Sequence, residues 1–227
     1  MLKEVRDSLY NKKGETKLNI FLNAIIAIVI LVLAAEIYFM ANYSGVYVVG
    51  QSMNNTLIGA TREEEIGGDY VYINKHSKPD YGDIVVVNCE GMKLNLDDGT
   101  KFLIKRAIAF GGDSVRIVEG QLEIKRNGSD KFEKVPEPYI SPEHNKEREN
   151  FPCDSDGNLI EEGYPVQEGY FFFMGDNRDN SHDSRKMGSF PISRVDGVVT
   201  EWSLEHKSFC TAFHNFFKFK LPGYFKK

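Results

Sequence analysis

Hydrophobic and polar residues are distributed unevenly along the chain, with one long apolar run near the N-terminus. Residues 20–40 read IFLNAIIAIVILVLAAEIYFM, with Asn23 and Glu36 near the two ends. An α-helix of about 20 residues spans the roughly 30 Å hydrocarbon core of a bilayer. We therefore predict one transmembrane helix over 20–40, preceded by a short N-terminal segment, 1–19.

A cleavable secretory signal is the alternative interpretation of this run. Its apolar region would be shorter, about 7–15 residues, and would end at a small-x-small cleavage site. In this chain Ala34-Ala35 is followed by Glu36 and then by bulky residues. A retained single-pass helix accounts better for the pattern.

From residue 41 the pattern changes to short runs of β-branched and aromatic residues separated by Gly, Asp and Asn, which is typical of strands. The predicted strands are 46–49, 70–73, 83–87, 102–104, 114–118, 121–124, 170–174 and 197–200. Glu119-Gly120 indicates a tight hairpin, and few windows have a helical period. We predict a mostly β, closed or sandwich-like domain over 41–227.

Two stretches of this domain differ from the rest. Residues 125–167 are rich in Lys, Glu, Pro, Asn and Asp, which predicts an inserted lobe or long loops between two halves of the core. The C-terminal tail, 208–227, mixes aromatic residues with lysines. That composition suits a segment lying on lipid headgroups, and docking on the domain fits the tail equally well.

Charge and cysteine content narrow the functional classes. The 227 residues carry a net charge of −5, which gives no support to nucleic-acid binding. The three cysteines, Cys89, Cys153 and Cys210, are widely spaced, so they form no zinc pattern and leave at least one thiol without an intrachain partner. We expect no metal and no cofactor.

The basic residues that flank the apolar run predict its orientation. Five of them precede the run, and 41–55 contains no Lys or Arg. Because basic residues stay preferentially on the cytoplasmic side, the N-terminus is expected in the cytoplasm and 41–227 outside the membrane.

Lys105 has an unusual position for a charged residue, between Phe102-Leu-Ile104 and an Ala-Ile-Ala-Phe run. It could be an edge-strand lysine whose amine reaches water. In apolar surroundings, however, desolvation favours the neutral amine, which can take a proton from a serine hydroxyl. Ser52, in the turn Gly50-Gln-Ser52, is the candidate serine.

The segment 175–188 reads GDNRDNSHDSRKMG and directly follows the apolar run 170–174. Its density of short polar side chains indicates a hydrogen-bonded network folded against the core; a glycine-rich turn with incidental charge is the alternative. Asp183 and Arg185 can form a charge-assisted pair, and Ser181 can orient an amine.

These segments resemble the boxes of bacterial type I signal peptidases, a family of Ser/Lys-dyad serine proteases, in the same order. G-D-N-R-D-N-S-x-D-S-R-x-x-G matches 175–188 at every defining position. S-M-x-x-T-L at 52–57 and K-R-x-I at 105–108 match in part, and 82–86 resembles a further box. With the apolar run, the resemblance covers about residues 20–200.

The resemblance implies a signal-peptidase-like β-barrel or sandwich catalytic domain and a role for each matching residue. Ser52 would be the nucleophile and Lys105 the general base. Ser181 would hold the Lys105 amine, and Asp183 and Arg185 would stabilise the network behind it. The Ser52 amide would donate to the oxyanion; some members add a serine hydroxyl where this chain has Gly50.

The resemblance also implies the substrates, which are preproteins with small side chains at −1 and −3 from the cut, processed at the surface of the lipid bilayer. Their shallow pockets would be lined by Val48, Met53, Leu57, Val86, Leu103 and Ile104, each of which could equally be ordinary β-core. The extended substrate would add a strand beside 46–50.

Two positions depart from the family pattern, which usually has Pro where this chain has Asn55 and Gly111. Losing each proline should loosen a turn by roughly 0.4–1 kcal/mol of chain entropy. A catalytically impaired surface protein that binds exported chains is therefore the alternative function. Self-cleaving repressor proteases share the dyad, but the apolar helix and the absence of a DNA-binding domain argue against them.

Overall fold

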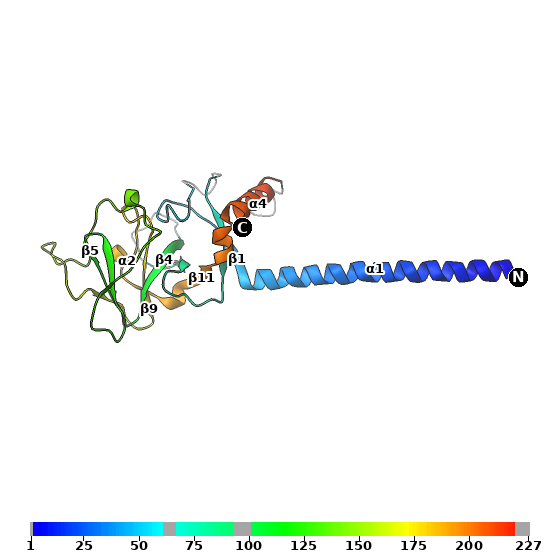
Figure 1. Ribbon diagram of the computed structural model, residues 1–227, viewed down its shortest axis with the longest axis horizontal. Coiled ribbons are helices and arrows are strands. Elements are labelled where there is room, and N and C mark those ends of the chain that lie inside the picture. The colour runs from blue at the N-terminus through cyan, green and yellow to red at the C-terminus, as the bar shows by residue number, and fades with distance from the viewer. Residues whose placement is uncertain (1, 61–66, 93–100, 221–227) are drawn as a thin grey trace. The chain divides into compact units, whose positions relative to one another are not determined.

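The computed structural model describes residues 2–60, 67–92 and 101–220, and the chain divides into two compact units between Tyr43 and Ser44 (Figure 1). The first unit is one long helix, α1 (Leu2–Asn42). Its stretch Thr16–Asn42 is long and apolar enough to cross a membrane. The apolar helix predicted over 20–40 lies within α1, and the helix also includes the segment that precedes it.

The second unit is built around two β-sheets. The larger has seven strands in the order β1 (Tyr43–Tyr47), β2 (Tyr70–Asn74), β11 (Val195–Val199), β3 (Ile84–Asn88), β4 (Phe102–Phe110), β9 (Tyr170–Met174) and β10 (Phe190–Pro191). The smaller has the order β7 (Glu133–Lys134), β6 (Gln121–Lys125), β5 (Ser114–Val118) and β8 (Tyr164–Pro165). The mostly β prediction is confirmed.

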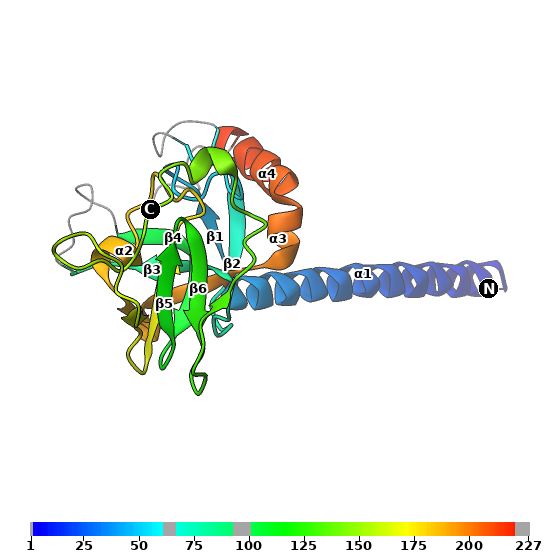
Figure 2. The ribbon, with the colours of Figure 1, turned by 60° about the vertical axis from the view of Figure 1, so that its left-hand side comes forward.

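Short helices connect or follow these strands. They are η1 (Pro142–His144), α2 (Ser184–Met187), η2 (Ile192–Arg194), α3 (Glu201–Glu205) and α4 (Lys207–Lys220). The stretch 125–167 contains β7, η1 and β8 and is otherwise irregular. The described part of the C-terminal tail forms α4, which packs against β2, as Figure 2 shows.

Strand β9 shows how the sequence pattern builds the core. Its four last residues are Phe-Phe-Phe-Met, all buried. Phe172 and Met174 join the cluster beneath the smaller sheet, whereas Phe171 and Phe173 join a cluster on the opposite face of the larger sheet. Because successive side chains alternate in direction, a continuous apolar run is what a strand buried on both faces requires.

Each predicted strand exists, and three of them differ in extent by more than one residue at an end. The run 102–104 is the start of a nine-residue strand, because β4 pairs with β3 along its first half and with β9 along its second half. The strand predicted over 46–49 is β1, which ends at Tyr47, and Val49 forms an isolated bridge with Ala60. The strand predicted over 197–200 begins two residues earlier.

Candidate active site

Lys105 and Ser52 are in direct contact in the second unit. Nζ of Lys105, on β4, lies 2.6 Å from Oγ of Ser52 and donates to the carbonyl of Ile104 at 3.0 Å. The lysine side chain is almost completely buried. Burial lowers the pKa of Lys105 to about 8, against the opposing influence of the Asp183 and Asp176 negative charges. The amine is therefore readily available in its neutral form.

Two glycines and a buried apolar side chain shape the turn that carries Ser52. Gly50 has φ +82° and donates its amide to the carbonyl of Ala60 at 2.8 Å. At Gly59 a Cβ atom would lie only 1.7 Å from the Gly50 carbonyl oxygen, so only glycine lets the two backbone segments approach this closely. Met53, just after the serine, is buried in the core.

The segment 175–188 holds the Ser52 turn from the other side. The amide of Asn177 donates to the carbonyl of Ser52 at 3.0 Å, and its Nδ2 donates to the carbonyl of Gln51 at 3.1 Å. A Cβ at Gly175 would lie 2.4 Å from the Ser52 carbonyl oxygen. Glycine at this position therefore lets the polar segment approach the backbone of Ser52 itself.

Asp183 and Arg185 form the expected pair behind the dyad. Nε and Nη2 of Arg185 each donate to the Asp183 carboxylate at 2.9 Å. The carboxylate also accepts from the Gly175 amide at 3.0 Å and caps α2. Burial opposes ionisation, but the Arg185 guanidinium and the Gly175 amide outweigh it and lower the pKa of Asp183. A permanent negative charge thus lies near the Lys105 amine.

Ser181 lies in this network without the contact that was expected of it. Its side chain is buried, and its Oγ makes no hydrogen bond of normal geometry among the described residues. Ser181 does contribute to the lowered pKa of Asp183, so its hydroxyl lies near that carboxylate. The Lys105 amine instead contacts Ser52 and Ile104. The amine-holding role of Ser181 stays a prediction.

A second buried ion pair was not predicted from the sequence. Arg106, next to the candidate base, donates to Asp176 from Nε at 2.8 Å and from Nη2 at 2.6 Å. Asp176 also accepts from the hydroxyl of Thr56, four residues after the nucleophile. The signal for this pair was an arginine in a strand that is apolar apart from Lys105, because a buried guanidinium requires a carboxylate partner.

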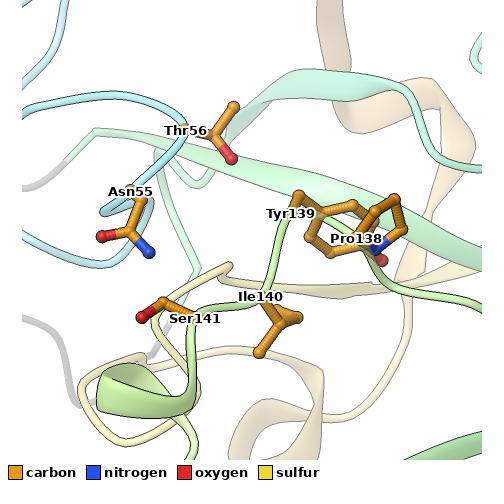
Figure 3. A pocket seen from close by; sticks show the side chains of 6 residues that line it. All are labelled: Asn55, Thr56, Pro138, Tyr139, Ile140 and Ser141. Atoms are coloured by element: carbon orange, nitrogen blue, oxygen red, sulfur yellow. The ribbon is translucent and has the colours of Figure 1, made fainter.

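The irregular stretch 125–167 reaches the same site. Glu137 forms an ion pair with Arg178, and the Tyr139 ring lies 3.8 Å from the Arg106 guanidinium carbon. A pocket of about 310 Å³ lies here, between the nucleophile turn and the residues around Tyr139 (Figure 3). Its lining residues are Asn55, Thr56, Pro138, Tyr139, Ile140 and Ser141.

The predicted substrate-binding residues are only partly brought together. Four of them, Val48, Met53, Leu57 and Val86, are buried in a single core cluster, and Ile104 packs against it. Leu103 packs instead with a different cluster, because neighbouring residues of a strand point to opposite faces. The first four have almost no exposed surface, which also fits ordinary core residues.

Comparisons with known proteins show the family of the chain. Residues 21–203 match the family model described as signal peptidase, peptidase S26. Signal peptidase I P of Bacillus subtilis subsp. natto is 31% identical, over 84% of this chain and 92% of its own. Signal peptidase I T of Bacillus subtilis strain 168 is 32% identical, over 86% and 91% respectively.

Among solved structures, a signal peptidase I from Enterococcus faecalis V583 has 26% sequence identity and a TM-score of 0.40, covering 55% of this chain and 98% of its own. The match to the family model covers most of the present chain and includes Ser52, Lys105 and 175–188. The chain therefore belongs to the signal peptidase family, peptidase S26, and is a serine endopeptidase whose N-terminal apolar helix fits a membrane anchor.

Proposed function

We propose that this chain removes signal peptides from exported preproteins at the outer face of the cytoplasmic membrane, with Ser52 as nucleophile and Lys105 as general base. The contact of 2.6 Å between Lys105 Nζ and Ser52 Oγ carries this proposal. The burial that lowers the pKa of the amine to about 8 supports it, because a base must be unprotonated to act.

The reaction follows from these two groups. Neutral Lys105 takes the hydroxyl proton of Ser52 as Oγ attacks the carbonyl carbon before the scissile bond. The ammonium then gives that proton to the leaving amine as the C–N bond breaks, which leaves an acyl-enzyme on Oγ. Lys105 next takes a proton from water, whose oxygen attacks the ester, and returns it to Ser52. The Ser52 amide would donate to the oxyanion at both stages.

The surrounding charges would keep the base usable at neutral to mildly alkaline pH. Burial alone disfavours the ammonium, and the Asp183 and Asp176 carboxylates limit that effect. Arg185 keeps Asp183 ionised, so it acts on the base only indirectly. We infer a positioning and tuning role for Asp183 and Arg185, separate from bond breaking.

The family and the geometry of the sheet support the proposed substrate class. Preproteins with small residues at −1 and −3 would place those side chains beside the apolar cluster under the Ser52 turn. Strand β1 is at an edge of the seven-stranded sheet, where an extended substrate can add main-chain hydrogen bonds along 46–50.

The chain length between anchor and nucleophile supports a membrane-surface reaction. Only 12 residues separate Met40 from Ser52, so the nucleophile is tethered within roughly 40 Å of the end of the predicted span. The basic residues before the span favour a cytoplasmic N-terminus, which would place the second unit outside the membrane. A signal peptide's cleavage site emerges at the same surface.

Cleavage of a preprotein by the full chain in phospholipid vesicles tests the proposal. We expect Ser52→Ala and Lys105→Ala to abolish cleavage, because each removes a reacting group. Ser208→Ala and Lys131→Ala, on exposed positions outside the site, are the matched controls and should cleave normally. Normal cleavage by either site variant would refute the assignment, and a wild-type chain that binds the preprotein without cutting it would instead support the impaired binding protein.

A further inference from the structure

The helix α4 contacts the rest of the second unit through polar side chains. Lys207 Nζ donates to the carbonyl of Thr56 at 2.7 Å, and the hydroxyl of Thr211 accepts from the Tyr70 amide at 2.8 Å. One turn further, the His214 ring stacks on Tyr70 with ring centroids 3.9 Å apart. The inward face of α4 is therefore largely polar.

The outward face of the same helix is aromatic. Phe209, Phe213 and Phe216 follow the i, i+4, i+7 spacing of one helical stripe. Their exposed fractions are 69%, 50% and 56%. A helix on a water-soluble domain normally turns its apolar stripe inward, so α4 has the reverse arrangement. Such a stripe is typical of a helix whose outer face meets an apolar medium.

Chain connectivity favours the bilayer as that medium. The helix packs against β2, and β2 lies next to β1 in the sheet (Figure 2). Strand β1 begins immediately after α1 ends, and its Tyr47 ring stacks near His214. Tyr47 follows Asn42 by five residues, a reach of at most roughly 18 Å. The α4 edge of the sheet is thus tethered close to the end of the apolar helix.

The charge of the C-terminal region also favours lipid over a second protein. Four lysines, at 218, 220, 226 and 227, follow the aromatic stripe in a chain whose net charge is −5. Aromatic residues combined with lysines bind membranes that contain anionic headgroups. A second copy of this acidic chain has no corresponding attraction.

We propose that α4 lies in the headgroup region of an anionic bilayer, with Phe209, Phe213 and Phe216 inserted toward the acyl chains. The helix would be a second membrane contact beside the α1 anchor. This inference goes beyond the proposed cleavage reaction and needs only that α1 is membrane-anchored, so its failure would leave the dyad assignment intact.

The chain's single tryptophan allows a direct test on the full protein. Trp202→Phe removes that tryptophan, and Phe213→Trp then puts the sole tryptophan on the stripe. The matched control is Lys131→Trp in the same background, in the turn between β6 and β7 of the smaller sheet. Each variant is reconstituted in vesicles of phosphatidylcholine and phosphatidylglycerol, with or without brominated acyl chains, and its fluorescence is measured with aqueous iodide as the second quencher.

We expect brominated lipid to quench most of the emission at position 213 and little at position 131, and iodide to quench position 213 several-fold less than position 131. Strong iodide quenching at position 213 without quenching by brominated lipid would overturn the proposal. Protection from both quenchers that increases with the protein-to-lipid ratio would also overturn it, because that result identifies a second copy as the occupant.

Discussion

Two opposing electrostatic effects set the pKa of Lys105. Burial disfavours its ammonium form, while the nearby Asp183 and Asp176 carboxylates favour it, and the resulting pKa is about 8. A fully exposed lysine would be protonated at this pH. The lysine therefore has the proton affinity of a base only because of where β4 places it.

The rate of cleavage should follow the ionisation of this lysine. We expect kcat/KM to rise about tenfold per pH unit below pH 8 and to level off above it, because the neutral fraction of the amine follows that curve. The measurement is a pH–rate profile over the range in which unfolding experiments show a folded chain. A flat profile from mildly acid to alkaline pH would contradict a lysine base.

Gly111, where the family usually has proline, has a packing reason to be glycine in this chain. A Cβ at this position would lie 2.7 Å from the Glu168 Cα and 2.9 Å from the Gln167 carbonyl oxygen. The turn at 167–168 therefore approaches the chain more closely than a proline permits. The missing proline was expected to loosen the turn at Gly111, but close contact with the backbone of Gln167 and Glu168 restrains this turn.

Restoring the family residue at this position should destabilise the protein. We expect Gly111→Pro to lower the free energy of unfolding by about 1–3 kcal/mol, because the added atoms must displace backbone. Denaturant unfolding of the full chain measures the change. Gly111→Ala adds only the Cβ and should also destabilise the protein, because the Cβ alone meets this backbone; a more stable Gly111→Pro protein would show that the turn has room for the ring.

At the scale of elements, the nucleophile turn depends on parts of the chain that are distant in sequence. Asn177, in the polar segment after β9, donates to the carbonyls of both Gln51 and Ser52. On another side, Lys207 of α4 donates to Thr56 and lies 3.2 Å from Asp69. These contacts hold the ends of the turn while leaving Ser52 partly exposed.

The Lys207 contact should contribute measurably to stability. We expect Lys207→Met to lower the free energy of unfolding by about 1 kcal/mol, since a charge-assisted hydrogen bond to a partly buried carbonyl is lost. Lys101→Met is the matched control, because its pair with Glu90 is well exposed and should contribute only a few tenths of a kcal/mol. Equal effects of the two substitutions on denaturant unfolding would contradict a specific role for Lys207.

Sequence reasoning reached the elements and the dyad but missed several contacts between elements. The strands could be predicted because alternation and apolar runs are local signals, and 175–188 could be recognised by its motif. The Arg106–Asp176 pair, by contrast, joins residues 70 positions apart, and only the β4–β9 pairing brings them together. The same limit applies to Leu103, whose separation from Ile104 depends on the faces of the sheet.

At the scale of the whole molecule, burying the Lys105 ammonium lowers the free energy of unfolding. In the unfolded chain Lys105 has its ordinary pKa of 10.5, and in the folded chain its pKa is about 8. Below pH 8 folding must bury an ammonium, so the full penalty is present there. As pH rises from 8 to 10.5 the folded chain is already neutral and the penalty disappears.

Removing the amine should therefore stabilise the fold while abolishing cleavage. We expect Lys105→Met to raise the free energy of unfolding at pH 7 by about 3 kcal/mol, which is the difference between a pKa of 10.5 and one of about 8 at 1.36 kcal/mol per pKa unit. The gain should shrink as pH approaches 10.5. Denaturant unfolding of both proteins at several pH values measures it; a variant that is less stable than wild type at pH 7 would contradict a costly buried ammonium.

Strand order and the C-terminal tail lay beyond what the sequence could predict. Strand β11 lies between β2 and β3, although more than a hundred residues separate it from either. The tail's composition fitted both a headgroup-bound segment and a docked one, and α4 in fact docks on β2 through its polar face. Composition alone could not separate the two faces of one helix.

The bracing of Ser52 by residues near the end of the chain has a consequence for biosynthesis. Ser52 and Lys105 both precede Asn177, Asp183 and Lys207 by more than 70 residues, so the ribosome makes them well before those residues. Until those residues arrive, the serine turn lacks its supporting hydrogen bonds and the amine lacks its neighbouring carboxylate. On the proposed roles of Ser52 and Lys105, a partly synthesised chain would therefore be inactive, because its serine turn and its amine would still lack the residues that position them.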